Sequence, residues 1–326
     1  MSDISAEDVS DALQSKWYEL NALGSRKRVL PAHPLKLYVG RSQAGNRIFQ
    51  FGCEHDFRDF RHINFKSLQF HVDEIGQILS IELNDEGHAS TYTAFLYDLV
   101  IQTSKMGKEH APLHLIARLQ DWSKLFQRSG KEGLTDSEAL GLRGELQLVK
   151  WLLGKTKKQR EVVEGWRGPN GDKSDIGWGT CRIEIKAKRA TSKPNVSISS
   201  VDQLAENPGT LFLYVANLNS GAEDGLSITD LTDEINDLIG ADLSTKHIFE
   251  RKLMLVGYDT DDAACQTLFQ DAGIQIYEVT DEFPKITTDM ISSAISKVVY
   301  ELELGQIQEY LVRKDRFWQK IGSSNE

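Results

Sequence analysis

Cysteine is scarce in this sequence, and the few that occur form no recognisable pair. Cys53, Cys181 and Cys265 are odd in number and far apart, without a C-x-x-C motif. A disulfide framework and a zinc ribbon both need paired cysteines, so the sequence favours neither. The composition fits a reducing compartment.

Long apolar runs are also missing. No stretch approaches the roughly 20 apolar residues that a transmembrane helix needs. The N-terminus, MSDISAEDVSDALQSKW, is acidic and polar, unlike a secretory signal. We therefore expect a soluble, cytoplasmic protein, and 326 residues are enough for two ordinary domains.

Positive charge is deficient over the whole chain, which has 38 basic and 48 acidic residues and a net charge of -10. Such a balance argues against a nucleic-acid partner, because phosphate binding relies on Lys and Arg. The distribution is uneven, however, since residues 141–200 carry 13 basic and 6 acidic residues. This local excess is typical of a polyanion-binding site, and a solvated charged face is the alternative.

The pattern of apolar residues divides the chain near residue 130, in a polar stretch over 128–136. Before this point we expect a helix around Trp17, four strands between residues 34 and 84, and helices over 91–105 and 113–126. We therefore predict a β-rich N-terminal domain over residues 1–130, which also carries helices and binds DNA or a protein partner.

Residues 131–326 alternate between helical and extended patterns. Helices are expected over 136–153, near Val201, over 230–239 and 244–250, and in a tail from Thr288. Strands are expected in the segment 171–189 and over 211–218, 253–258 and 273–279. Mixed elements of this kind form a central sheet covered on both faces, so we predict an α/β fold.

The segment GDKSDIGWGTCRIEIKAKR, residues 171–189, predicts a β-hairpin. A two-residue type II′ turn at Gly179 and Thr180 makes residues whose numbers sum to 359 face each other. One face of the hairpin is then apolar and can be buried. That face consists of Ile176, Trp178, Cys181, Ile183, Ile185 and Ala187.

The opposite face of the predicted hairpin carries two acids and a base. Asp175 stands opposite Glu184, with β-carbons about 5 Å apart, and Lys186 projects beside them. Facing carboxylates repel each other, so a plain surface strand explains this pair less well than a cation site does. Hard oxygen ligands suit Mg²⁺ or Mn²⁺, and the backbone carbonyl of Ile185 is a candidate ligand. Such a metal polarises a phosphoryl oxygen and activates a water, which Lys186 can orient.

The order Asp175, an eight-residue interval, then Glu184-Ile185-Lys186 resembles the D…(D/E)-x-K signature of PD-(D/E)XK, restriction-endonuclease-like nucleases. Ser174 stands where the family name has proline. The resemblance covers residues 136–220 and implies a restriction-endonuclease-like mixed sheet flanked by helices. It also implies Mg²⁺-dependent cleavage of DNA, with Asp175, Glu184 and Lys186 as the catalytic residues.

Further site residues follow from this resemblance. Superfamily members place an acid on the helix before the hairpin, which Glu145 matches, and some carry a glutamine on the following helix, which Gln203 matches. A surface glutamate and a solvated glutamine are the respective alternatives. Phosphate contacts with DNA are expected from Lys188, Arg189 and Lys193, and Gln203 is a further candidate DNA contact.

Three other patterns are rejected. The loop GPNGDKS is no P-loop, because Asp172 interrupts the Gly-Lys step and a strand follows. The acid-x-Lys match at Glu250 falls at a predicted helix-to-strand junction without a partner strand. The spacing of a further set fits no compact zinc site. That set is Cys53, His55, His62 and His71.

The resemblance also bears on the partners and the oligomeric state of the protein. The layout is similar to PD-(D/E)XK motif proteins of prokaryotic restriction and phage-defence loci, which occur beside helicase-like ATPases and DNA methyltransferases. The overall acidity leaves open a non-catalytic nucleic-acid or protein-binding subunit that cleaves only with a partner or not at all. A homodimer is expected, because one such centre cuts one strand. Its candidate surfaces are the N-terminal half and the tail, with Ile291, Ile295, Val298, Val299 and Trp318. The alternative is that this tail packs on its own nuclease core.

Overall fold

The chain forms two compact units in the computed structural model. Unit 1 comprises Met1–Glu132 and Ala241–Gly257, and unit 2 comprises Gly133–Gly240 and Tyr258–Glu326. The structure describes residues 4–14, 16–17, 19–20, 22–53, 56–58, 68–73, 75–129, 133–170, 174–205, 209–221, 223–292 and 294–323. No helix in these ranges combines the length and the apolar composition that a transmembrane span requires.

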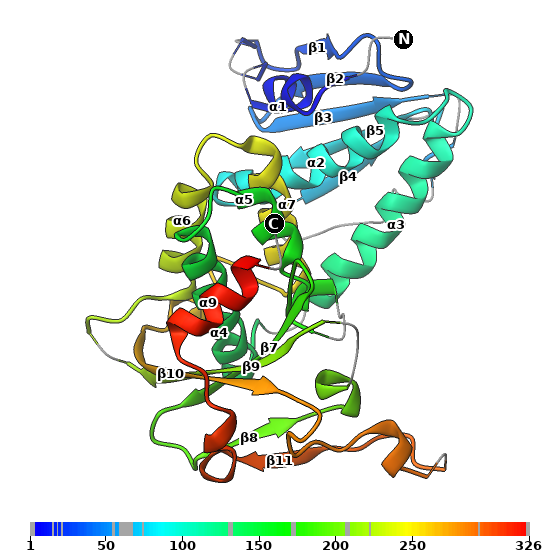
Figure 1. Cartoon of the computed structure of the whole chain (residues 1–326). Helices are drawn as coiled ribbons and strands as arrows, with labels where there is room; N and C mark the ends of the chain where they lie inside the picture. Colours follow the sequence, from blue (N-terminus) through cyan, green and yellow to red (C-terminus); the bar gives the residue numbers. More distant parts are fainter. Residues whose placement is uncertain are drawn as a thin grey trace. The chain divides into compact units, whose positions relative to one another are not determined.

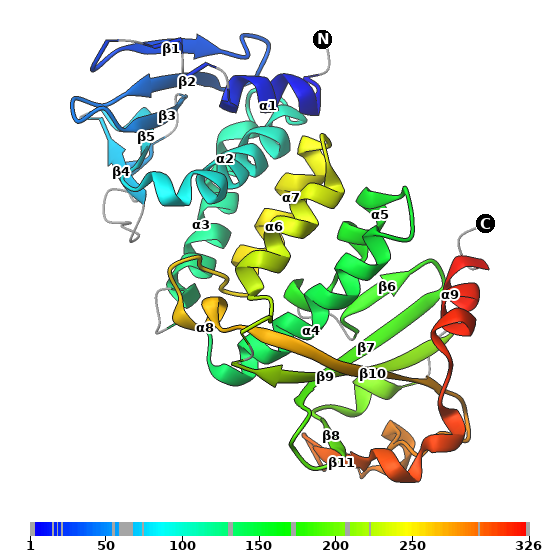
Figure 2. The same ribbon diagram turned by 90° about the vertical axis from the view of Figure 1, so that its left-hand side faces the viewer.

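Unit 1 is a five-stranded antiparallel sheet with helices. Its elements are α1 (Ala6–Gln14), β1 (Arg26–Val29), β2 (Lys36–Arg41), β3 (Arg47–Gly52), β4 (Leu68–Val72), β5 (Ile78–Leu83), the 3-10 helix η2 (Glu86–His88), α2 (Ala89–Ser104), α3 (Ala111–Ser129) and α7 (Leu243–Leu255). The strand order is β1-β2-β3-β5-β4. Figure 2 shows α1 and α2 on one side of this sheet.

Alternation along the strands explains how this sheet packs. Side chains such as Leu37, Phe49 and Ile81 are 0% exposed and form the core with α1, α2 and α3. The residues between them point to the other face of the sheet. The expected glycine turns occur, with positive φ of 88° at Gly45 and 82° at Gly76.

Two expectations for the elements of unit 1 are wrong. The first helix ends at Gln14, and Trp17 lies beyond it, 1% exposed, with its indole Nε1 donating to Ile48 O at 3.2 Å. Residues 253–258 form no strand, because α7 runs to Leu255 and packs on α2. A short apolar run such as LMLV does not distinguish a strand from a buried helix turn.

The packing of α7 also changes the expected domain limits. The imidazole of His247 on α7 stacks on the ring of Tyr97 on α2, with centroids 4.2 Å apart. Arg251 Nη1 lies 3.8 Å from Asp98 Oδ1, a carboxylate that also pairs with Arg118. Residues 241–257 therefore belong to unit 1, whereas the predicted domain 131–326 included them.

Unit 2 combines a central sheet with a smaller one (Figure 1). Its helices and strands are α4 (Asp136–Leu153), α5 (Gln159–Gly165), β6 (Ile176–Trp178), β7 (Cys181–Arg189), β8 (Asn195–Ile198), β9 (Leu211–Ser220), α6 (Ile228–Ile239), α8 (Ala263–Gln266), β10 (Phe269–Val279), β11 (Tyr300–Glu303) and α9 (Lys314–Ser323). Its 3-10 helices are η3 (Gly168–Asn170), η4 (Val201–Leu204), η5 (Thr288–Met290), η6 (Leu304–Gln306) and η7 (Gln308–Tyr310).

The central sheet of unit 2 has the order β10-β9-β7-β6, and β8 pairs with β11 separately. Strand β7 runs parallel to β9 and antiparallel to β6, so the sheet is mixed and the predicted α/β fold is confirmed. Helix α4 packs closely on it at Gly144, where an added β-carbon would lie 2.8 Å from Ala187 Cβ. Figure 2 shows α4 and α6 on one side of the sheet and β8 and β11 on the other.

The predicted helical tail from Thr288 is wrong. This segment has the 3-10 turn η5, then β11 paired with β8, then the 3-10 turns η6 and η7, and in the described residues its α-helix is α9. Ile295 and Val299 are each 53% exposed and belong to no helical stripe. Pairing between strands that are distant in sequence overrides the local helical spacing. Trp318 packs within unit 2, 5.5 Å from the ring of Trp151, and the dimer itself stays a prediction.

Candidate active site

The hairpin formed by β6 and β7 has the predicted register, with Ile176 opposite Ile183 and Trp178 opposite Cys181. Gly179 has a φ of 56°, the positive value that the first residue of a type II′ turn requires. The six residues of the apolar face are buried, apart from a half-buried Ala187. Local sequence thus places Glu184 and Lys186 together on the other face of β7.

Asp175 lies at the edge of β7, just before β6 begins. Its carboxylate Oδ2 accepts a hydrogen bond from Ile185 N at 2.6 Å. Its backbone carbonyl accepts hydrogen bonds from Arg167 N at 2.7 Å and Gly168 N at 3.0 Å. The pairing of β6 with β7 ends at Ile176 and Ile183. Beyond this pair, the Asp175 side chain continues the contact with β7 by accepting the hydrogen bond from the Ile185 amide.

The backbone of Ile185 faces this same edge. In the parallel pair of β7 and β9, Arg182 N donates to Thr210 O, and Ala190 N donates to Leu218 O. Alternate residues of a strand present their N–H and C=O groups to opposite sides, so even-numbered residues of β7 face β9. The carbonyl of Ile185 therefore points away from β9, toward the side on which Asp175 lies.

Glu184 and Lys186 form a buried ion pair beside Asp175. Glu184 is 1% exposed, and its Oε1 lies 2.9 Å from Lys186 Nζ. Lys186 Nζ also donates to Gln203 Oε1 at 3.1 Å, and this oxygen accepts a second hydrogen bond from Ser199 N at 2.9 Å. Gln203, on η4, thus holds the lysine ammonium on the Glu184 side of the sheet.

Glu145 reaches the site from α4. Its Oε2 accepts a hydrogen bond from Trp166 Nε1 at 2.6 Å. A β-carbon added to Gly168 would lie 2.6 Å from this oxygen and 3.4 Å from Asp175 Oδ1. Gly168 thus lies close to both carboxylates, and a side chain at this position would require the Glu145 carboxylate to shift.

Burial and mutual repulsion disfavour the charged forms of these acids. Burial, then the charge of Asp175, raises the pKa of Glu184 to about 8. The same two causes raise the pKa of Glu145 to about 8, with a smaller contribution from Glu184. Burial also raises the pKa of Asp175, against the Ile185 hydrogen bond and the Lys186 charge. The ammonium of Lys186 therefore does not offset the repulsion among the three acids.

These residues carry oxygen ligands of the type that a divalent cation prefers. Glu184 Oε1 is buried, and its cationic neighbour is the Lys186 ammonium at 2.9 Å. This one ammonium faces three acids whose charged forms burial and mutual repulsion disfavour, so a further cation would stabilise them. Carboxylate and carbonyl oxygens are the ligands that Mg²⁺ and Mn²⁺ prefer. Asp175, Glu184 and the Ile185 carbonyl supply such ligands, and Glu145 supplies another carboxylate.

The three predicted phosphate-binding residues do not join the cluster. Lys188 Nζ lies 3.3 Å from Arg189 O and 3.4 Å from Ser192 O, in the turn after β7. Arg189 pairs with Asp136 at 3.6 Å and faces the opposite side of the sheet from Lys186. Lys193 is exposed in the same turn.

Two arginines that sequence reasoning missed flank the acids instead. A β-carbon added to Gly177 would lie 2.5 Å from Arg167 Cζ, so this exposed guanidinium lies over Gly177. Gly177 faces the same side as Glu184, and its cross-strand neighbour is Arg182, whose Nη2 donates to Ala205 O at 2.8 Å. Only the basic character of the segment 141–200 hinted at these residues.

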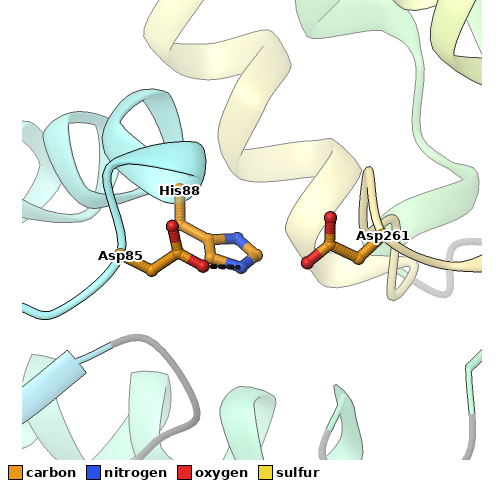
Figure 3. Close-up of side chains that lie close together, drawn as sticks. All are labelled: Asp85, His88 and Asp261. Carbon is orange, nitrogen blue, oxygen red and sulfur yellow. Dashed lines mark ion pairs between the residues drawn. The ribbon is translucent and has the colours of Figure 1, made fainter.

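A second group of titratable side chains lies outside this cluster. In unit 1, His88 Nε2 lies 3.9 Å from Asp85 Oδ2 (Figure 3). Asp261, also drawn there, belongs to unit 2, and we assign no site to the three residues. Of the rejected zinc set, His55 and His62 lie outside the described residues, while Cys53 is half-buried and His71 lies 3.3 Å from Glu82 Oε2.

Comparison with protein families places the chain in a family. Residues 13–305 match the family described as "Putative PD-(D/E)XK family member, (DUF4420)". No curated protein and no solved structure matches the chain. The match includes most of unit 1, about which the hairpin motif alone says nothing. Because the match spans more than half of its length, the chain belongs to this PD-(D/E)XK family, and its membership suggests a nuclease.

Proposed function

We propose that the chain is a metal-dependent endonuclease that hydrolyses phosphodiester bonds in DNA, with Asp175, Glu184 and Lys186 as catalytic residues. The observation that carries this proposal is that the buried Glu184 carboxylate, the Asp175 carboxylate and the Lys186 ammonium come together on β7. PD-(D/E)XK nucleases generally use divalent metals.

Each residue of the cluster has a role in this proposal. Asp175, Glu184 and the Ile185 carbonyl hold Mg²⁺ or Mn²⁺, and Glu145 contributes a further carboxylate to the metal site. When bound, the cation supplies Lewis-acid stabilisation to the phosphoryl group. Lys186 orients the attacking water and stabilises charge on the phosphate, while Gln203 positions its ammonium.

The basic residues around the cluster suit the phosphates of the bound strand. Arg167 and Arg182 lie on the turn side of Glu184, and Lys186 and Lys188 lie on the other side along the same face. Cations on both sides of the acids offset their repulsion of a polyanion. We propose Arg167 as a phosphate contact in addition to Lys188, Arg189 and Lys193.

Cleavage of plasmid DNA tests the activity. Wild-type protein with Mg²⁺ or Mn²⁺ is expected to nick or cut the plasmid, and Lys186→Ala is expected to abolish cleavage while leaving the fold intact. Lys155→Ala removes the same charge from an exposed position and serves as the control. Equal cutting by wild type and Lys186→Ala would remove the catalytic assignment.

Metal binding distinguishes a nuclease from the alternative of a non-catalytic subunit. Calorimetric titration with Mn²⁺ is expected to show binding that Glu184→Ala removes. A vestigial site would give the same titration for both proteins, and the chain would then act as a binding subunit. The family resemblance supports a role in restriction or phage defence, with a helicase-like ATPase or a methyltransferase as partner.

A homodimer stays part of the proposal, because cleavage of both strands usually pairs two such centres by two-fold symmetry. Light scattering measures the mass directly. A mass near the 36.7 kDa of one chain would remove the dimer and favour a nicking enzyme.

A further inference from the structure

The outer face of the unit 1 sheet gathers basic residues around a tyrosine. In the register of β1 and β2, Arg28 stands opposite Tyr38 and Arg26 stands opposite Gly40. Alternation places Lys36 on this same face, two residues before Tyr38. The guanidinium of Arg26 lies 5.3 Å from the centroid of the Tyr38 ring, a cation–π contact.

Glycines make the floor around Tyr38 flat. A β-carbon added to Gly52 on β3 would lie 3.5 Å from Lys36 Cβ and 4.0 Å from the Tyr38 ring. One added to Gly40 would lie 3.5 Å from Arg26 Cβ. Both glycines therefore belong to this face and leave space beside the ring, as close approach of a planar ligand requires.

The cations of this face have no acidic partner among the residues that the structure describes. Arg26, Arg28 and Lys36 are exposed and form no ion pair with any residue in the described part of the chain. Lys27, which points to the other side of β1, is by contrast neutralised by Glu19. Glu82 is a buried acid of β5 on the outer face. It already pairs with His71 and accepts a hydrogen bond from Asn46.

We infer that this face binds single-stranded DNA, with a base stacked on the Tyr38 and Arg26 planes and with phosphates on Arg28 and Lys36. An aromatic ring among unpaired cations on a flat sheet suits a strand whose bases are unstacked. The bases of a duplex are already stacked and cannot reach a ring on a flat surface. The inference deepens the proposed function, because it names an unpaired stretch as the form of DNA that the enzyme holds.

Fluorescence anisotropy of a labelled oligonucleotide in EDTA tests this surface without cleavage. Wild-type protein is expected to bind the single strand more tightly than the matching duplex. Tyr38→Ala is expected to weaken single-strand binding about fivefold or more, the scale of one lost base stack. Tyr38→Phe keeps the ring and is expected to bind like wild type.

A pair of charge variants serves if Tyr38→Ala does not fold. Arg28→Gln is expected to weaken binding, and Lys108→Gln, which removes one exposed charge elsewhere in unit 1, is expected to have no effect. The inference is overturned by absence of binding, by preference for the duplex, or by equal affinity of wild type, Tyr38→Ala and Arg28→Gln. Because EDTA prevents metal-dependent cleavage, these results do not depend on whether the active site is correct.

Discussion

The acid face of β7 in unit 2 and the outer face of the unit 1 sheet use charge in opposite ways. Glu184 is 1% exposed, and its neighbours are carboxylates whose pKa values burial raises. Arg26 and Arg28 are exposed to solvent. Buried charge interacts strongly over short distances, whereas exposed charge acts weakly and is screened by salt. The buried charges of the β7 face therefore suit catalysis at a single phosphodiester bond. The exposed charges of the unit 1 face suit binding of a long polyanion.

The largest expected effect comes from removing the buried charge of Glu184. Glu184→Gln keeps the shape of the side chain but removes a ligand charge. We expect cleavage to fall about 100-fold or more, the scale seen when a charge-stabilising group leaves a reaction centre. Glu161→Gln, at an exposed position of α5, is the matched control. Initial cleavage rates with saturating Mn²⁺ measure both, and a small effect at Glu184 would erase the contrast between the two faces.

A smaller effect is expected from Gly168, which touches the acids only by its backbone. In Gly168→Ala the new β-carbon would lie 2.6 Å from Glu145 Oε2, so the carboxylate or the segment must move. We expect Mn²⁺ affinity to fall about tenfold, as for other groups that support metal ligands.

Gly141→Ala supplies the control for this change. Gly141 lies in α4, and its added β-carbon meets nothing within 4 Å. Metal affinity should stay constant, and the free energy of unfolding should rise by up to about 1 kcal/mol, because alanine favours helix more than glycine does. Equal titrations for the two variants would show that the Gly168 contact is irrelevant to the metal site.

The raised pKa values predict how stability depends on pH in the absence of metal. The pKa of Glu184 rises on folding from 4.5 to about 8, so in this range the folded state binds more protons than the unfolded state. Stability therefore falls as pH rises through this window. Thermal melting in EDTA should show this decline. Glu184→Gln should make it smaller, because Glu145 and Asp175 still have raised pKa values, and Mn²⁺ should restore stability at the alkaline end.

The smallest expected effect concerns salt at the outer face of unit 1. Each phosphate contact on a single strand contributes about 0.7 to the slope of log affinity against log salt concentration. The double variant Arg28→Gln/Lys36→Gln should therefore lower the slope by about 1.4. Lys105→Gln/Lys108→Gln should leave it unchanged. An equal change of slope in both double variants would mean that DNA binding depends on the net charge of unit 1 and on no particular face of its sheet.

The hairpin of the active site could be predicted from sequence because its causes are local. The turn at Gly179 fixes the register, and alternation then sets which side chains share a face. The contact of Glu145 with Trp166 and the placement of Arg167 over Gly177 could not be predicted. Both depend on how segments outside the hairpin pack on it, and the spacing of residues in the sequence does not predict that packing.

The errors at α7 and in the tail have a related cause. The apolar residues of the segment 253–258 fit a strand and a helix equally well, and contact with α2 decides for the helix. In the tail, pairing of β11 with β8 decides against the helix that the spacing of Ile291 and Ile295 suggested. Strand pairing between distant segments is the information that a local pattern lacks.

The Asp175 carboxylate has a consequence for the choice of an inactive form of the protein. Strand β6 pairs only with the first three residues of β7, and beyond it Asp175 Oδ2 occupies the otherwise open amide of Ile185. An Asp175→Ala protein would lose activity and also uncover a strand edge that can recruit another chain. Insolubility of such a protein would then be mistaken for a defect of folding. Lys186, which leaves this edge closed, is the better position for trapping a substrate complex.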